Sequence, residues 1–172
     1  MTTHPPRGWR LLAGPFALLL AMAGCARLSP TASFAIPPIS TQEARVWFYR
    51  DLDPNGSMAT PYIRLNGAAV GVSQAGGAFY RDVPPGHYHI SADSYLPDPI
   101  MTRDVDLVSG QEAFAKVLSL DNWIQGGGQD AGGEYHRDTF YVWLMPPETA
   151  RPQIAQSSFY GEGMLTAAAP PR

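Results

Sequence analysis

The chain has 172 residues, with 17 glycines and 17 prolines but only 16% charged residues, and its formal net charge is −3. Cleavage of an N-terminal signal would also remove Arg7 and Arg10 and leave a more acidic mature chain. Phosphate backbones repel an acidic chain that has no cluster of lysine and arginine, so nucleic-acid binding is excluded. The length suits one domain, and a core of that size folds without a metal or disulfide.

The N-terminus has the pattern of an export signal. Two arginines precede an apolar run over residues 11–23, which is too short to span a bilayer of about 30 Å. Residues 22–25 read Met-Ala-Gly-Cys and resemble the bacterial lipobox, in which the cysteine is diacylated and becomes the mature N-terminus. We therefore predict a lipoprotein signal peptide over 1–24, cleavage between Gly24 and Cys25, and lipidation of Cys25. The alternative is an ordinary cleaved signal with a cysteine nearby by chance.

Cys25 is the only cysteine of the chain, so it has no partner for an internal disulfide. A lipidated cysteine carries two or three acyl chains, which anchor a protein stably where one chain alone would be marginal. Ala26 stands where an aspartate would suggest retention in the inner membrane, and by resemblance to enterobacterial sorting this favours the outer membrane. The expected location is the cell envelope, with the domain facing the periplasm or the cell surface.

Both flanks of the expected domain lack regular periodicity. Residues 25–43 contain Pro30, Pro37 and Pro38, and we predict that they form a flexible tether with a reach of roughly 60 Å when fully extended. Residues 153–172 are predicted to be a mostly disordered tail, in which Phe159 and Tyr160 are the residues that could dock on the domain.

Residues 44–152 alternate between apolar and polar positions with a period of two, which indicates strands. Asn66-Gly67 lies between two such runs and predicts a two-residue hairpin, because a type I′ turn needs a positive φ at both positions. Short strands at regular spacing predict an all-β fold, an antiparallel β-sandwich of seven or eight strands. The expected strands are 44–50, 62–65, 68–72, 78–83, 87–93, 103–108, 113–120 and 139–145.

Five motifs in order resemble one family of bacterial envelope proteins. They are Ala-Arg-Val-Trp-Phe-Tyr-Arg (44–50), the hairpin at 64–71, Pro-Gly-His-Tyr-His-Ile-Ser-Ala (85–92), Val-Asp-Leu-Val-Ser-Gly (105–110) and Leu-Met-Pro-Pro-Glu-Thr-Ala (144–150). Over residues 44–154 the chain is similar to the family known as domain of unknown function 2846, and the third motif also looks like modules of the carboxypeptidase-regulatory or transthyretin-like kind. The resemblance implies a small β-sandwich, often on lipoproteins, without an established activity and without catalytic residues to carry over.

Two histidines on one predicted strand form the most specific candidate site. His87, His89 and Asp93 share one face of that strand, and two imidazoles with a carboxylate can ligate Zn²⁺ or Cu²⁺. His136 would add a ligand only if the loop 121–138 folded over this face. The alternative is a solvated strand face with no ligand. Metal binding through these residues is the alternative hypothesis, and we expect no cofactor.

Two loops suggest binding more weakly. Residues 51–56 match the first half of a calcium-binding loop, but Tyr62 stands where the bidentate glutamate belongs, so an ordinary turn is expected. The glycine-rich segment 121–138 does not have the pattern of a phosphate-binding loop. It is predicted to be a mobile insertion, or else a binding lid that uses Trp123 and Tyr135.

Catalysis finds little support in the sequence. There is no Gly-x-Ser-x-Gly motif, and the only thiol is expected to be acylated. Ser91 would lie about 6–7 Å from His89 along one strand, which is too far for a hydrogen bond. We therefore expect a protein that is not an enzyme.

Large aromatic residues mark the first and last predicted strands. Trp47 and Tyr49 share one face of the first strand, and Tyr141 and Trp143 share one face of the last. They are either covered by the long loop or the C-terminal tail, or exposed as a patch that binds a protein or glycan. The sequence thus predicts a non-catalytic binding or assembly module with an envelope protein or peptidoglycan as partner. The rivals are a metal- or small-ligand-binding protein and a purely structural component.

Overall fold

The structure is a computed structural model that describes residues 29–94, 98–125 and 134–163. The predicted signal peptide, Gly24 and Cys25 lie outside the described residues, as does the middle of the glycine-rich loop. In chain order the elements are η1 (Thr31–Ser33), β1 (Ala44–Tyr49), β2 (Tyr62–Leu65), β3 (Ala68–Val72), β4 (Gly77–Val83), β5 (Gly86–Ala92), η2 (Pro99–Met101), β6 (Arg103–Leu107), β7 (Glu112–Gln125), β8 (Glu134–Leu144), α1 (Pro147–Gln156) and β9 (Ser158–Glu162).

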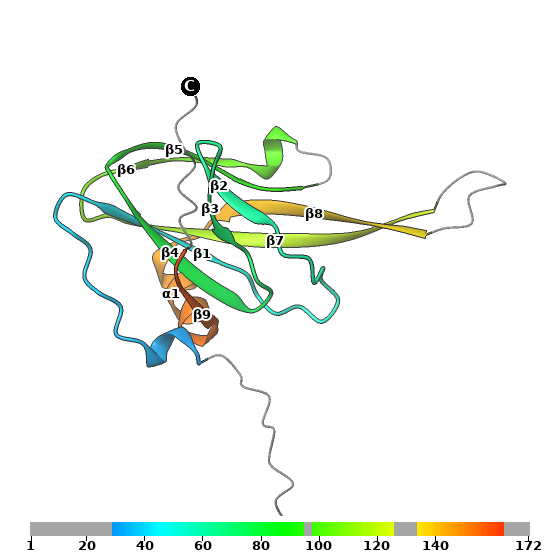
Figure 1. Cartoon of the computed structure of the whole chain (residues 1–172), viewed down its shortest axis with the longest axis horizontal. Helices are drawn as coiled ribbons and strands as arrows, with labels where there is room; N and C mark the ends of the chain where they lie inside the picture. Colours follow the sequence, from blue (N-terminus) through cyan, green and yellow to red (C-terminus); the bar gives the residue numbers. More distant parts are fainter. Residues whose placement is uncertain (1–28, 95–97, 126–133, 164–172) are drawn as a thin grey trace, which may run out of the picture.

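Two sheets pack face to face, which confirms the predicted all-β sandwich (Figure 1). The five-stranded sheet has the order β8-β7-β1-β4-β9, and the four-stranded sheet has the order β3-β2-β5-β6. The prediction that all pairing is antiparallel is wrong in two places, because β7 runs parallel to β1 and β9 runs parallel to β4. The described residues form nine strands. The additional one is β9, which follows the helix that the sequence analysis did not predict.

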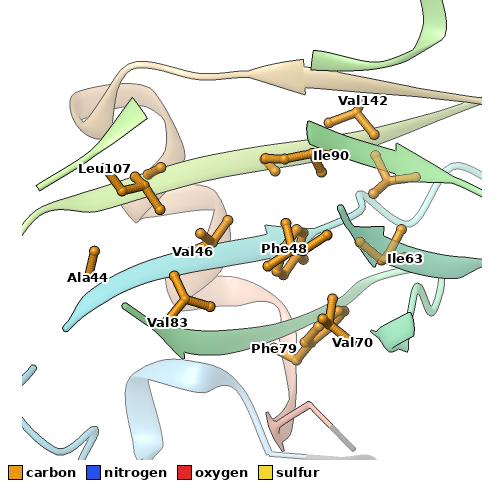
Figure 2. Packing of buried hydrophobic residues seen from close by; sticks show 14 of the residues in the cluster. Ala44, Val46, Phe48, Ile63, Val70, Phe79, Val83, Ile90, Leu107 and Val142 are labelled. Atoms are coloured by element: carbon orange, nitrogen blue, oxygen red, sulfur yellow. The ribbon is translucent and has the colours of Figure 1, made fainter. Parts of the chain in front are cut away.

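The centre of the larger sheet is β1, and all six of its residues are buried. Its neighbours β4 and β7 pair with it on either side, so no backbone edge is left open. Figure 2 shows Val46 and Phe48 of β1 in the main core together with Ile63, Val70 and Ile90 of the other sheet. The alternate residues of β1 point to the opposite face of the sheet and enter a second apolar cluster.

The hairpin between β2 and β3 has the predicted turn. Asn66 and Gly67 have φ values of 50° and 82°, the positive angles that a type I′ turn requires. The Asn66 side chain also accepts a hydrogen bond from the His89 backbone N–H at 2.8 Å and donates to the His87 carbonyl at 3.2 Å. The turn therefore holds β5 in register with the hairpin.

The prediction of a mostly disordered tail from residue 153 is wrong for the residues that the structure describes. Helix α1 extends to Gln156, and β9 follows it directly and pairs with β4. The helix has Pro147 in its first turn, which is favourable there, but Pro152 inside it removes a backbone donor. Only Ala150 and Ile154 of α1 are buried, so its apolar stripe is too short to be recognised as a helical period.

The flexible tether predicted over 25–43 is also wrong from Ser29 onward. Pro30 forms a β-bridge with Ser158, and Thr31 donates two hydrogen bonds to the Ser157 carbonyl, from its N–H at 2.8 Å and from Oγ1 at 3.0 Å. The ring of Phe34 contacts that of Phe159 at 4.9 Å between centroids. In the described ranges, no helix has both the length and the apolar character needed to cross a membrane.

Substitutions in β9 test whether the C-terminal segment is part of the fold. The Phe159 ring lies within 6.4 Å, between centroids, of the rings of Trp47 and Tyr80 as well as Phe34. We predict that Phe159→Ala lowers the free energy of unfolding by about 2–4 kcal/mol, measured by urea denaturation. Glu162→Ala in the same strand is the control and should change it by less than about 0.5 kcal/mol, because the side chain is exposed. Equal stabilities of the two variants would contradict a docked β9.

Candidate functional site

A groove of about 500 Å³ lies on the outer face of the five-stranded sheet, opposite the main core. Figure 1 shows α1 on this side of the sheet and the four-stranded sheet on the other. Residues 31–39 form one wall and the exposed turns of α1 form the other, with β1 and β7 beneath. The lining residues are Thr31, Ala32, Phe34, Ile36, Pro37, Pro38, Ile39, Arg45, Trp47, Glu112, Phe114, Arg151, Ile154 and Ala155.

Glu112 joins the groove's base to its helical wall. One of its carboxylate oxygens accepts a hydrogen bond from Trp47 Nε1 at 3.0 Å, and the other accepts one from Arg151 Nη2 at 2.5 Å. The Arg151 guanidinium also lies 5.6 Å from the centre of the Phe114 ring. Both oxygens of the only carboxylate that lines the groove are thus engaged with neighbouring side chains.

Arg45 joins the groove's base to the N-terminal wall. Its Nε and Nη2 donate to the two carboxylate oxygens of Asp82 at 2.6 and 2.7 Å, and its Nη1 donates to the Pro37 carbonyl at 2.9 Å. The guanidinium stacks over the Tyr80 ring at 4.0 Å. Burial by itself would lower the pKa of Arg45, but the hydrogen bonds and negative charge of Asp82 outweigh it and raise that pKa.

The four predicted aromatic residues do not form one patch. Trp47 and Tyr49 are 6% and 1% exposed, beneath the outer layer formed by α1 and the N-terminal segment. Tyr141 is half-buried on β8, and Trp143 is 52% exposed. Because β7 lies between β1 and β8, the two pairs are separated in the sheet. Of the four, only Trp47 lines the groove.

The two tryptophans should therefore differ sharply on truncation. Trp47→Ala removes a buried indole and its hydrogen bond to Glu112, so we predict a loss of about 3–5 kcal/mol in the free energy of unfolding. Trp143→Ala should lose less than about 1 kcal/mol, because half of the side chain is already in solvent. Urea denaturation of both variants measures the difference. A stable Trp47→Ala variant would mean that the outer layer does not depend on this indole.

The predicted histidine site has different carboxylates from those expected. His87 and His89 lie on β5 directly opposite Asp106 and Asp104 of β6. Nδ1 of His87 lies 2.8 Å from Asp106 Oδ1, and Nδ1 of His89 lies 2.7 Å from Asp104 Oδ1. A further pair joins His87 Nε2 to Asp104 Oδ1 at 3.7 Å. All four side chains are exposed to solvent.

Asp93, the carboxylate named with these histidines in the sequence analysis, is held elsewhere. Arg64 donates to both of its oxygens, from Nε at 2.7 Å and from Nη2 at 2.9 Å. Within the described ranges, no group of three or more histidine, cysteine, aspartate or glutamate side chains is arranged to hold a metal ion. The two aspartates in the alternating sequence Arg-Asp-Val-Asp-Leu of β6 are the partners of His87 and His89. The sequence analysis missed them because the register between two strands cannot be read from either strand alone.

The hydrogen bond with Asp106 raises the pKa of His87 above its usual value, and the charges of Asp106 and Asp104 add to this effect. Because the pKa of His87 is higher in the folded chain, protonation of His87 stabilises the fold at pH values below about 6.5, the usual pKa of histidine. This contribution to stability is lost as the pH rises through the raised pKa.

We predict that NMR titration of the His87 imidazole will show its pKa falling in Asp106→Asn and falling by less in Asp104→Asn. Asp93→Asn is the matched control and should leave the pKa of His87 unchanged, because Asp93 pairs with Arg64. An unchanged pKa of His87 in Asp106→Asn would contradict the cross-strand pair.

The calcium-like segment after β1 is a turn held by basic residues. Asp51 Oδ2 lies 2.5 Å from Nζ of Lys116, and Asp53 Oδ1 accepts a hydrogen bond from the Asn55 N–H at 2.9 Å. Arg50, which is 3% exposed, donates to the carbonyls of Ser57 and Ala59. Asp51 and Asp53, two of the residues at calcium-ligand positions, therefore serve an ion pair and a turn.

A polar network beneath α1 was not predicted from the sequence. Tyr49 Oη donates to Gln153 Oε1 at 2.9 Å, and Lys116 Nζ donates to the same oxygen at 3.2 Å. Burial, with a smaller contribution from Asp51, raises the pKa of Tyr49 to about 12, so this hydroxyl stays protonated at neutral pH. Tyr49 is therefore a hydrogen-bond donor that holds the helix in place.

The comparisons with known proteins give no family. No protein-family model matches the sequence, and neither the curated proteins nor the solved structures contain a significant match. Membership in the family of domain of unknown function 2846 therefore stays a prediction from the five motifs. The prediction of a mobile insertion over 121–138 is wrong at its two ends, because residues 121–125 of β7 pair with residues 134–138 of β8. Trp123, Tyr135 and His136 lie in the part of this hairpin whose side chains are not described.

Proposed function

We propose that this protein is a lipid-anchored component of a bacterial cell envelope, and that its β-sandwich is a non-catalytic module that binds an apolar segment of another envelope protein in the groove over β1 and β7. The groove carries the proposal. Its volume of about 500 Å³ lies in the range of ligand sites, about 300–1,000 Å³. The lipobox-like residues before Cys25 support the anchor.

The polar groups of the groove favour a peptide over a glycan. Arg45 and Glu112 already form hydrogen bonds with Asp82, Trp47 and Arg151. A sugar polymer would need many donors and acceptors that are open to it, since polar groups that lose water without a partner weaken binding. Apart from Arg151 and from Thr31, whose hydroxyl donates to the Ser157 carbonyl, the remaining lining is apolar or aromatic, which suits the side chains of a protein segment.

The histidines do not favour catalysis. In the described ranges the hydrogen bonds of the His87 and His89 rings are made with carboxylates, and none joins these rings to a serine or cysteine. A nucleophilic mechanism needs a base within hydrogen-bond reach of the nucleophile. This supports a binding role over a hydrolytic one.

The anchor and the groove can be tested in one experiment on the full-length chain expressed in a Gram-negative bacterium. A photo-crosslinking amino acid at Ala155 lies in the groove, and one at Ala69 of β3 is the control on the other sheet; both alanines are half-buried. A labelled fatty acid reports acylation, and Cys25→Ala should abolish this label. We expect a defined protein adduct from position 155 and not from 69.

The outcomes separate the two parts of the proposal. A chain that is not acylated would overturn the anchor. A peptidoglycan adduct at position 155 would replace the protein partner with a glycan, and equal or absent adducts at both positions would overturn the groove as the binding site. The alternative function, metal or small-ligand binding through His87, His89 and Asp93, predicts stoichiometric metal in the purified protein, which elemental analysis of the same samples measures.

A further inference from the structure

The folded domain begins very close to the predicted lipid anchor. Pro30 is already paired with Ser158, and the Ser29 carbonyl accepts a hydrogen bond from the Phe159 N–H at 3.2 Å. Cys25 precedes Ser29 by four positions, and that length of chain spans at most about 14 Å when fully extended. The reach of roughly 60 Å expected from a tether up to residue 43 is therefore not available.

Exposed apolar side chains lie around this starting point. Phe34 is 44% exposed, Leu52 66% and Tyr160 42%. We call these three residues the anchor-side patch. Such residues favour the interface of a bilayer, where aromatic rings and aliphatic chains meet the headgroups.

Each member of the anchor-side patch is connected to the start of β9. Phe34 packs against Phe159, and Tyr160 follows it in the strand. Leu52 lies against Gly76, where a Cβ would come within 3.1 Å of it, and the Gly76 carbonyl accepts a hydrogen bond from the Ser158 N–H at 2.9 Å. The patch thus surrounds the site where the described chain begins.

The opposite end of the molecule carries exposed carboxylates, next to the exposed apolar side chains of Ile100 and Val108 on either side of β6. Figure 1 places β9 at the end where the described chain begins, and β5 and β6 at the other. Strand β6 carries Asp104 and Asp106, whose side chains are 59% and 87% exposed. Anionic phospholipids repel exposed carboxylates, which disfavours contact of this end with a membrane. Asp51 and Glu162 are also exposed near the anchor-side patch, so the membrane side is assigned by the short reach from Cys25 and not by charge.

We propose that the edge of the sandwich formed by β9, with Phe34, Leu52 and Tyr160 around it, rests on the phospholipid surface that holds the acylated Cys25, and that the His87/Asp106 face of β5 and β6 points away from the membrane. This proposal depends on the lipid anchor of the proposed function. Phe34 also lines the groove, but the orientation does not require a partner in the groove. Because the chain from Cys25 to Ser29 spans at most about 14 Å, the end of the domain at Ser29 must lie near the bilayer. The anchor-side patch provides the apolar contact with the lipid.

Fluorescence quenching in vesicles tests this orientation. Acylation consumes the only native thiol, so a single introduced cysteine can be labelled on the full-length lipidated protein. Leu52→Cys reports on the anchor-side patch, and Val108→Cys, at the turn after β6, is the matched control, since these side chains are 66% and 65% exposed. Each is labelled with an environment-sensitive dye in vesicles of phosphatidylethanolamine and phosphatidylglycerol that contain brominated phospholipid.

We expect quenching to be several-fold stronger at position 52 than at position 108. Equal quenching at the two positions, stronger quenching at 108, or no quenching at either would overturn the orientation. In each of these cases, flotation of both samples with the vesicles would show that the anchor itself still holds. If the full-length chain fails to float with the vesicles and carries no acyl group by mass spectrometry, the anchor itself fails, and the orientation fails with it.

Discussion

A central strand that is buried on both faces is the constraint on which the rest of this structure depends. The residues of β1 alternate between two clusters, so one sheet face must be covered by the second sheet and the other by something else. In this chain the outer cover is built from short pieces: a ten-residue helix that buries only Ala150 and Ile154, and the segment that precedes β1. Neither piece has enough apolar surface to fold alone, so each is stabilised by the sheet that it covers.

The two sides of the sheet are held together by different forces. The inner side is a contiguous apolar core, where packing dominates. The outer side mixes aromatic rings with buried charged groups, and Arg45 and Lys116 reach carboxylates or amide oxygens in the pieces above and beside them. These hydrogen bonds and ion pairs hold the two walls of the groove, residues 31–39 and α1, at fixed positions, but they do not fill all the space between the walls. A groove on this side and a dense core on the other follow from that difference.

Alternating patterns and turn residues were enough to predict the strands of the sandwich, because period-two burial and the Asn66-Gly67 turn are local properties of the sequence. The strand β9 and the parallel pairs were not predictable in this way, because parallel partners are distant in sequence and their pairing has no local signal. The histidines were recognised, but their partners in β6 depend on register between strands. Pro30 supported the wrong prediction of a flexible tether, since it lies in an ordered segment that pairs with Ser158.

The contacts of Thr31 with the Ser157 carbonyl join residues that are 126 positions apart in the chain. Under the proposed lipid anchor the chain is exported, and Ser157 then emerges 126 positions after Thr31, so Thr31 has no docking site until that point. Closing a loop of that length carries an entropic penalty that is repaid only when β9 is in place. Under that proposal, acylation of Cys25 would precede folding, because the N-terminal segment from Pro30 docks only after Ser157 and β9 have emerged.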